Sequence, residues 1–214
     1  AEVRNDGIQR GNGRRGYRVM NDVIENADKY TDEAVKAAKN PLLHVCCAPC
    51  ACGVLPRVIS ARPTLYFYNP NIDTAAEFEK RLREVEKLAA FYGLPLIVEP
   101  YDHDEFLACV KGEENAPEGG SRCAKCIALR IRKTALKATE GGFTEFCTTL
   151  SVSPHKSARL INELGLEAEK ATGVIWIPSD FKKRNGFYES TVKSREMGLY
   201  RQVYCGCEFA KERK

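Results

Sequence analysis

The stretch Leu42-Leu43-His44-Val45-Cys46-Cys47-Ala48-Pro49-Cys50 joins an apolar run to a turn that contains three cysteines. A short apolar run that ends in a turn and continues into a helical pattern is typical of the first strand and helix of a parallel α/β sheet. In such sheets ligands bind beyond the carboxyl ends of the strands, where a nucleotide-binding protein carries its phosphate loop. The stretch therefore predicts both a sheet and a site built from thiols.

Four further apolar runs extend this strand into a sheet. Helical patterns separate the runs, and this alternation predicts an α/β fold with an open, mostly parallel sheet and helices on both faces. We expect the strands at residues 42–46, 64–68, 96–99, 143–148 and 174–177.

Two helical patterns stand out between the strands. One runs from Asp73 to Tyr92 and stops at Gly93. The other follows Cys123 and places Cys123 and Cys126 one turn apart at its N-terminal end. Backbone amides and the helix dipole favour thiolate at that end, which makes both cysteines candidate ligands.

Seven of the ten cysteines fall into three tight clusters. A structural zinc ion closes with four ligands, and a cubane iron–sulfur cluster also takes four cysteines. Seven thiols exceed the need of one centre and predict two metal centres side by side. The predicted ligands are Cys46, Cys47, Cys50, Cys123, Cys126, Cys205 and Cys207.

The remaining cysteines are Cys52, Cys109 and Cys147. Cys109 and Cys147 lie in apolar runs and are predicted to belong to the core. A disulfide framework is typical of short secreted chains, whereas this chain has 214 residues and is 43% hydrophobic, and no signal-peptide pattern opens it. We therefore expect free thiols in a soluble, cytoplasmic protein, and no run of apolar residues is long enough to span a membrane.

The net charge of +4 is too small to establish a nucleic-acid partner, but its distribution is uneven. Residues 1–20 combine several arginines with glycines and predict a flexible basic arm. Residues 181–214 are also rich in lysine and arginine, as expected for a polyanion-binding surface or for a solvated face. We divide the chain into a basic N-terminal extension, residues 1–40, flexible in part, and an α/β metal-binding catalytic domain, residues 41–214.

Polar loops follow the other predicted strands. No G-x-G-x-x-G or Walker A sequence is present, so nothing in the sequence supports a bound nucleotide. Because the carboxyl ends of parallel strands meet at one edge of the sheet, we expect these loops to line a pocket around the metals. The loops are residues 69–73, 101–104, 151–156 and 178–183.

Six stretches of the chain resemble the motifs of one family, the cobalamin-independent epoxyqueuosine reductases, or QueH family. The resemblance runs in the family's order from Leu42 to Phe209 and leaves residues 1–40 outside it. The stretches are residues 43–50, 66–72, 117–126, 148–156, 178–183 and 199–207.

The resemblance implies a fold similar to the nucleotide α-hydrolase type, a HUP-like Rossmannoid sheet. It also implies an oxidoreductase of tRNA processing that converts epoxyqueuosine at the wobble position of tRNA to queuosine. Members of the family are understood to hold a 4Fe–4S cluster with a separate, mononuclear iron beside it. An external low-potential electron donor would complete the reaction.

The division of the seven cysteines between the two centres also follows from the resemblance. Relatives can carry Asp where this chain has Cys50, and an oxygen ligand suits an isolated iron better than a cubane corner. The cluster ligands are then Cys47, Cys123, Cys126 and one of Cys205 or Cys207. The iron ligands are then Cys46, Cys50 and the other cysteine of that pair.

Conversion of an epoxide to an alkene requires two electrons and two protons and releases water. The proton must come from a side chain near the metals, and each candidate has a structural alternative as a cap, turn or solvated residue. The candidate acids are Asp180, Lys182, His155 and Asp102. The candidate contacts to the diol or base of the substrate are Tyr68, Asn69, Asn71 and Tyr204.

Two other functions stay open at this point. A zinc-binding protein that binds or modifies tRNA without redox chemistry uses the same kind of cysteine spacing. A thiol–disulfide reductase would use the cysteine pairs directly, although adjacent cysteines rarely reach good disulfide geometry.

Overall fold

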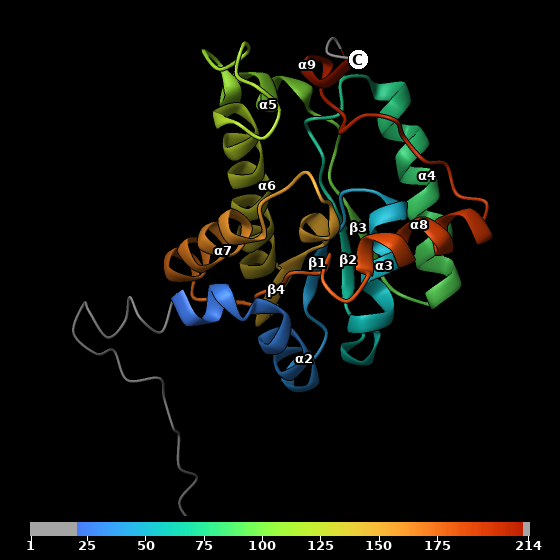
Figure 1. The fold of residues 1–214 in the computed structure, drawn as a ribbon, viewed down its shortest axis with the longest axis vertical. Helices are drawn as coiled ribbons and strands as arrows, with labels where there is room; N and C mark the ends of the chain where they lie inside the picture. Colours follow the sequence, from blue (N-terminus) through green and yellow to red (C-terminus); the bar gives the residue numbers. More distant parts are fainter. Residues whose placement is uncertain (1–20, 212–214) are drawn as a thin grey trace, which may run out of the picture.

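The computed structural model describes residues 21–211 (Figure 1). Residues 1–20, the predicted basic arm, lie outside the described residues, as do residues 212–214. Five parallel strands form one sheet in the order β3-β2-β1-β4-β5, which confirms the predicted α/β class. The strands are β1 (Leu42–His44), β2 (Thr64–Phe67), β3 (Leu96–Val98), β4 (Glu145–Thr148) and β5 (Ile175–Trp176).

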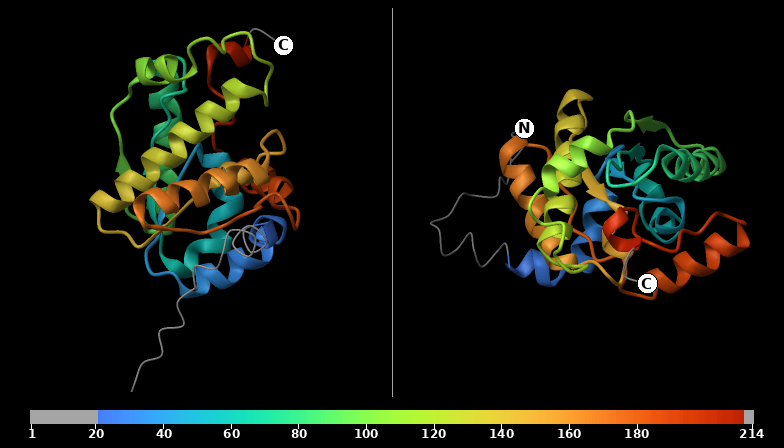
Figure 2. Two further views of the ribbon diagram at one scale, coloured as in Figure 1. Left: turned by 90° about the vertical axis from the view of Figure 1, so that its left-hand side faces the viewer. Right: turned by 90° about the horizontal axis from the view of Figure 1, so that it is seen from above.

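Helices cover both faces of the sheet (Figures 1 and 2). On one face lie α3 (Ala48–Val58) and α4 (Ala75–Tyr92), with α8 (Gly186–Glu196) packed on α3. On the other face lie α6 (Ser121–Glu140) and α7 (Ala158–Thr172). No helix among residues 21–211 combines the length and the apolar character needed to cross a bilayer.

Alternation along the strands explains these two layers. Leu43 and Leu65 point into the core beneath α3 and α4, while Leu42 and Tyr66 point into the core beneath α6 and α7. Strands β1 and β2 are buried on both faces, which is why they read as continuous apolar runs in the sequence.

The two predicted helices are present, and each begins two residues away from its predicted start. Thr74 accepts a hydrogen bond from the amide of Glu77 at 3.2 Å, so α4 begins at Ala75 rather than Asp73 and ends before Gly93. Helix α6 begins at Ser121, which places Cys123 in its first turn.

Shorter elements complete the described chain. They are the 3₁₀ helices η1 (Ile59–Ala61) and η2 (Thr149–Val152), and the helices α5 (His103–Val110) and α9 (Glu208–Lys211). Helix α2 (Ala27–Ala37) belongs to the predicted extension and buries Ala27, Thr31 and Val35. The extension therefore contributes a helix packed on the α/β domain.

Candidate metal centre

The strand order places the first cysteine cluster at the centre of the sheet edge. Strand β1 lies between β2 and β4, where the strand order reverses, and Cys46, Cys47 and Cys50 follow its carboxyl end. Cys47 occupies the N-cap position of α3 with extended backbone, and Pro49 stands in the first turn. As a result the sulfur atoms of Cys46, Cys47 and Cys50 all lie within 4.8 Å of one another.

The three thiols are joined by hydrogen bonds. The thiols of Cys47 and Cys50 hydrogen-bond to Cys46 and hold the pKa of Cys46 well below its ordinary value. Cys46 in turn raises the pKa of both Cys47 and Cys50. Thr149 donates to the Sγ of Cys46 at 3.3 Å and accepts from its amide at 3.1 Å. This polar support favours a negatively charged sulfur, which is the form that binds metal.

A second group of four cysteines lies beside the first. Cys123 and Cys126 come from the start of α6, and Cys205 and Cys207 come from the segment before α9. All four line a small cavity of about 60 Å³. Burial raises the pKa of Cys207 to about 11.

Residues 205–207, which we call the 205–207 tail, are held by a side chain of α4 and by the backbone of the β2–α4 loop. The buried guanidinium of Arg81 donates to the carbonyl of Cys205 at 3.0 Å, and the amide of Asp73 donates to the carbonyl of Gly206 at 3.0 Å. Gly206 has φ +140°, a conformation that L side chains rarely adopt. A Cβ there would lie 2.9 Å from Nδ2 of Asn71. Glycine therefore lets the tail approach the β2–α4 loop.

A larger cavity of about 400 Å³ adjoins the smaller one. Cys205, Arg130, His155 and Lys156 line both cavities. The wall of the larger cavity also includes Cys46, Cys47, Cys50 and Tyr204. The structure thus brings the seven predicted ligands to two adjoining cavities, and all of them are free thiols.

The other three cysteines lie apart from these cavities. Cys52 and Cys147 are fully buried in the core, and burial raises the pKa of Cys147 to about 12. Cys109 is half-buried, and its thiol donates to the carbonyl of Lys125 at 3.6 Å. The predicted core position is confirmed for Cys147, whereas it is wrong for Cys109, which stays half-buried.

Two cations at the site, the buried Arg130 and the half-buried Lys156, were not singled out from the sequence. Arg130 is only 2% exposed and donates to the carbonyl of Cys126 at 3.3 Å. Burial alone would lower the pKa of Lys156, but the thiols of Cys205 and Cys46 raise it above its ordinary value. Both side chains keep their positive charge and offset the charge of the surrounding thiolates. Arg130 carries a signal in the sequence, because it follows Cys126 by four residues on the same helix.

The amino-acid sequence matches one known family of proteins. A family model described as Epoxyqueuosine reductase QueH matches residues 41–213. This chain belongs to the QueH family.

Individual members of the QueH family align over most of the chain. The epoxyqueuosine reductase QueH of Streptococcus pyogenes is 38% identical over 176 residues, covering 79% of this chain and 69% of the relative. The protein of the same name from Thermotoga maritima is 37% identical and is covered to 88% of its length. That of Acinetobacter baylyi is 32% identical over 196 residues and aligns with 90% of this chain and 85% of its own.

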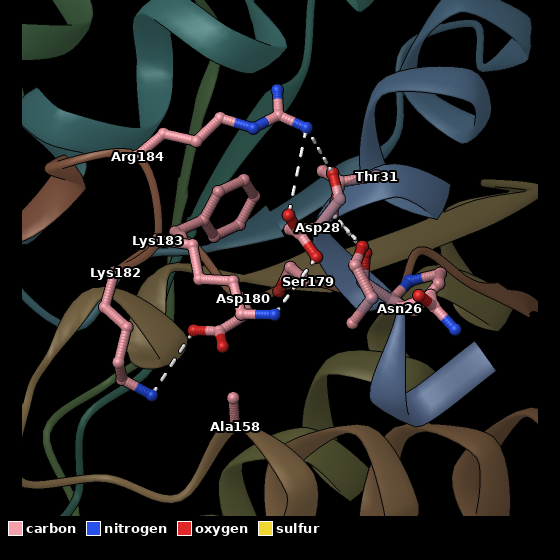
Figure 3. Close-up of polar contacts among 12 residues, drawn as sticks. Asn26, Asp28, Thr31, Ala158, Ser179, Asp180, Lys182, Lys183 and Arg184 are labelled. Atoms are coloured by element: carbon pink, nitrogen blue, oxygen red, sulfur yellow. Dashed lines mark hydrogen bonds and ion pairs between the residues drawn. The ribbon is translucent and has the colours of Figure 1, made fainter. Parts of the chain in front are cut away.

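Only one of the four candidate acids lines the smaller or the larger cavity. His155 is exposed and lines both of them. Asp102 is the N-cap of α5, where it accepts from the amide of Glu105 at 3.1 Å. Asp180 and Lys182 form an ion pair at 3.4 Å outside the lining of both cavities (Figure 3). Lys182 nevertheless touches the site, because it donates to the carbonyl of Lys156 at 3.0 Å.

Two of the four candidate substrate contacts line these cavities, and the other two do not. Tyr204 lines the larger cavity and Asn71 the smaller one. Asn69 is buried and donates to the carbonyl of Val45 at 2.9 Å, which closes the β1 and β2 loops against each other. Tyr68 donates to Glu105 at 2.7 Å in a separate pocket between β2 and α6. Loop 151–156 thus reaches both cavities, and loop 69–73 reaches the smaller one through Asn71.

Proposed function

We propose that this chain is an epoxyqueuosine reductase that removes the epoxide oxygen of epoxyqueuosine at the wobble position of tRNA and leaves queuosine. One observation carries the proposal. Seven cysteines from three distant segments converge on two adjoining cavities at the switch point of the sheet, in a chain of the QueH family. The printed names of the relatives state the same activity.

The donor set fits two iron centres. A cubane cluster requires four thiolates, and the three remaining thiolates suit one further iron. We propose that the seven cysteines hold a 4Fe–4S cluster and a mononuclear iron, with Cys46 and Cys50 on the iron. Cys47 lies in the same 4.8 Å group as these two, so its assignment to the cluster stays a prediction. When bound, such centres supply single electrons at low potential and a Lewis acid for oxygen.

The residues of the chain would orient the substrate and deliver protons. The conversion consumes two electrons and two protons, breaks both C–O bonds of the epoxide and releases one water. A cavity of about 400 Å³ is large enough to take a single extruded base, and Tyr204 offers an aromatic ring in its wall. His155 and Lys156 line the same cavity and are the proton donors that we propose. Asp180 and Lys182 would act through the backbone of Lys156.

The partners follow from this chemistry. The substrate is tRNA that already carries the epoxide, and the reducing equivalents come from an external low-potential donor in the cytoplasm. A zinc protein without redox activity is the competing outcome, because thiolates also bind zinc.

Metal and product analysis on one anaerobic preparation tests the proposal. We expect about five irons and four acid-labile sulfides per chain, with little zinc. The same preparation, reduced with dithionite and methyl viologen, should convert epoxyqueuosine to queuosine in tRNA, as read by mass spectrometry of the nucleosides. A colourless protein with zinc and no sulfide, inactive under these conditions, would overturn it.

A further inference from the structure

Helix α2 lies against residues 178–184, which we call the 178–184 loop, between β5 and α8 (Figure 3). This helix precedes residue 41, where the match to the family begins. The loop belongs to the matched domain and carries Asp180 and Lys182. An element outside the residues that the family model matches therefore holds a loop inside them.

The innermost contact between them is buried. Thr31 of α2 is fully buried, and its hydroxyl lies 2.7 Å from the carbonyl of Pro178 and 2.6 Å from that of Ala27. A hydroxyl has a single proton, so the two carbonyls share one donor. If that donor is lost, the Pro178 carbonyl is left buried without a partner.

Charged contacts continue along the same face of α2. Lys183 pairs with Asp28 at 3.2 Å, and Arg184 pairs with Asp32. Arg184 also donates to the backbone carbonyl of Asp28 at 3.2 Å. The guanidinium of Arg57 on α3 lies 3.7 Å from Asp32. The carboxylates of α2 thus link the loop to the helix that carries Cys50.

The backbone at the end of the loop is strained. Arg184 has φ 55° and Asn185 has φ 62°, and both lie in the left-handed region. That conformation is unfavourable for a residue with a Cβ. Contacts made by the side chain of Arg184 to α2 oppose relaxation of this turn.

The loop in turn supports the wall of the larger cavity. Lys182 donates to the carbonyl of Lys156 at 3.0 Å, and the amide of Phe181 donates to Ser151 at 3.3 Å. Residues 151–156 contribute His155 and Lys156 to both cavities. The contacts therefore run from α2 to the loop and from the loop to the backbone of a residue at the site.

We propose that α2 positions the 178–184 loop, and through Lys182 the Lys156 segment, for the reaction at the cysteine cavities. The part of this inference that concerns the reaction rests on the proposed function. The part that concerns the loop does not. Thr31, Asp28 and Asp32 are positioning residues, because none of them lines either cavity.

Hydrogen exchange on the full chain tests the loop directly. The amides of Ser179, Phe181 and Lys183 each have an acceptor and should exchange slowly. In Thr31→Val, which keeps the shape of the side chain, we expect these amides to exchange about tenfold faster, while β1 and β4 stay as in the wild type. Thr139→Val is the control, because Thr139 only donates to a carbonyl of its own helix.

A double-mutant cycle tests the charged contacts separately. Asp32→Asn should speed exchange in the loop about threefold, and Arg184→Gln at least as much, because Arg184 also contacts Asp28. The double variant should resemble Arg184→Gln. Glu33→Gln is the matched control, since it removes the neighbouring charge of α2 at an exposed position. Fully additive effects would show that the two residues act apart and would overturn this contact.

Single-turnover kinetics then separate positioning from mere stability. We expect Thr31→Val to lower the rate of the chemical step about fivefold or more, with KM for tRNA and the iron content unchanged. Wild-type exchange in the loop of Thr31→Val overturns the proposal outright. Faster exchange of the loop amides with an unchanged rate of the chemical step overturns the role of α2 in the reaction. A wild-type protein without reductase activity refutes the proposed function and leaves the exchange result standing.

Discussion

The turn at residues 46–50 and the 205–207 tail both bring cysteines to the site, yet the fold holds them in different ways. The turn continues β1, which pairs with β2 and β4, and leads straight into α3. The tail lies between α8 and the four-residue helix α9, outside the sheet. Arg81, Asp73 and the glycine at 206 fix it instead.

This difference separates two kinds of residue that the site needs. At the turn, the position of the thiols follows from the strand order, so the thiols themselves are the sensitive groups. At the tail, residues that bind no metal decide where Cys205 and Cys207 lie. Substitutions of cysteine should therefore be severe in both regions, whereas substitutions of neighbouring residues should be severe only in the tail.

The largest effect is expected at the turn. Cys50→Ala should abolish turnover and remove iron, because the group of three sulfurs within 4.8 Å loses a member. Cys147→Ala is the control, since Cys147 is equally a thiol but lies in the core, and it should keep full metal content at a cost of about 1 kcal/mol. Iron and sulfide analysis with a turnover assay measures both. Full activity of Cys50→Ala would contradict the two-centre assignment.

The same contrast explains how much of the molecule the sequence predicts. All five expected strands are present. Strand β1 is predictable because a parallel strand that is buried on both faces must be apolar at Leu42 and Leu43 alike. The position of the first cysteine cluster follows from the same rule, because ligands gather at the carboxyl ends of such strands. The order of the strands in the sheet was not predicted from the sequence and is given by the structure.

The roles of the rim residues were harder to predict. Asn69 and Asp102 have short polar side chains, and each satisfies a nearby backbone group instead of facing the cavities. Lysine and arginine in a sequence suggest a solvated surface, so the burial of Arg130 could only be found in three dimensions. Asp180 and Lys182 meet the site only through a backbone carbonyl, a contact that no motif records.

The second effect tests the tail through a residue that is not a ligand. Gly206→Ala should destabilise the tail by about 2 kcal/mol or more, since the new Cβ meets Asn71 and Arg81 in a backbone conformation that alanine avoids. We expect loss of iron and at least a tenfold loss of turnover. Gly198→Ala is the control, because its φ is +62° with nothing within 4 Å of the Cβ. It should cost about 1 kcal/mol and leave the iron in place.

The results for Gly206→Ala and Gly198→Ala decide whether the tail differs from the turn at residues 46–50. If Gly206→Ala keeps its iron and its rate, the tail adjusts as freely as an ordinary loop, and the two regions do not differ. If Gly198→Ala loses iron as well, backbone strain anywhere in the segment after α8 is enough to release the iron. The contact with Asn71 is then not the cause of the loss.

The smallest effect concerns Tyr204, which directly precedes the 205–207 tail and also lines the larger cavity. Its hydroxyl donates to Asp73 at 2.8 Å, and burial together with that bond raises its pKa to about 12, so it stays protonated at neutral pH. Tyr204→Phe should therefore cost about 1 kcal/mol of stability and less than a tenfold loss of rate, with the same ratio to the wild type from pH 6 to pH 9.

Tyr204→Leu distinguishes the ring of Tyr204 from its hydroxyl. Phenylalanine keeps the aromatic face that a base can stack on, whereas leucine removes it, so only Tyr204→Leu should raise KM for tRNA, by about tenfold. The side chain of Asp73 still pairs with Lys211 in both variants, which limits the damage to the tail. Equal KM values for the two variants would assign Tyr204 to the support of the tail alone. A pH-dependent loss in Tyr204→Phe would instead assign the hydroxyl a part in proton transfer, and the tail would then supply chemistry as well as ligands.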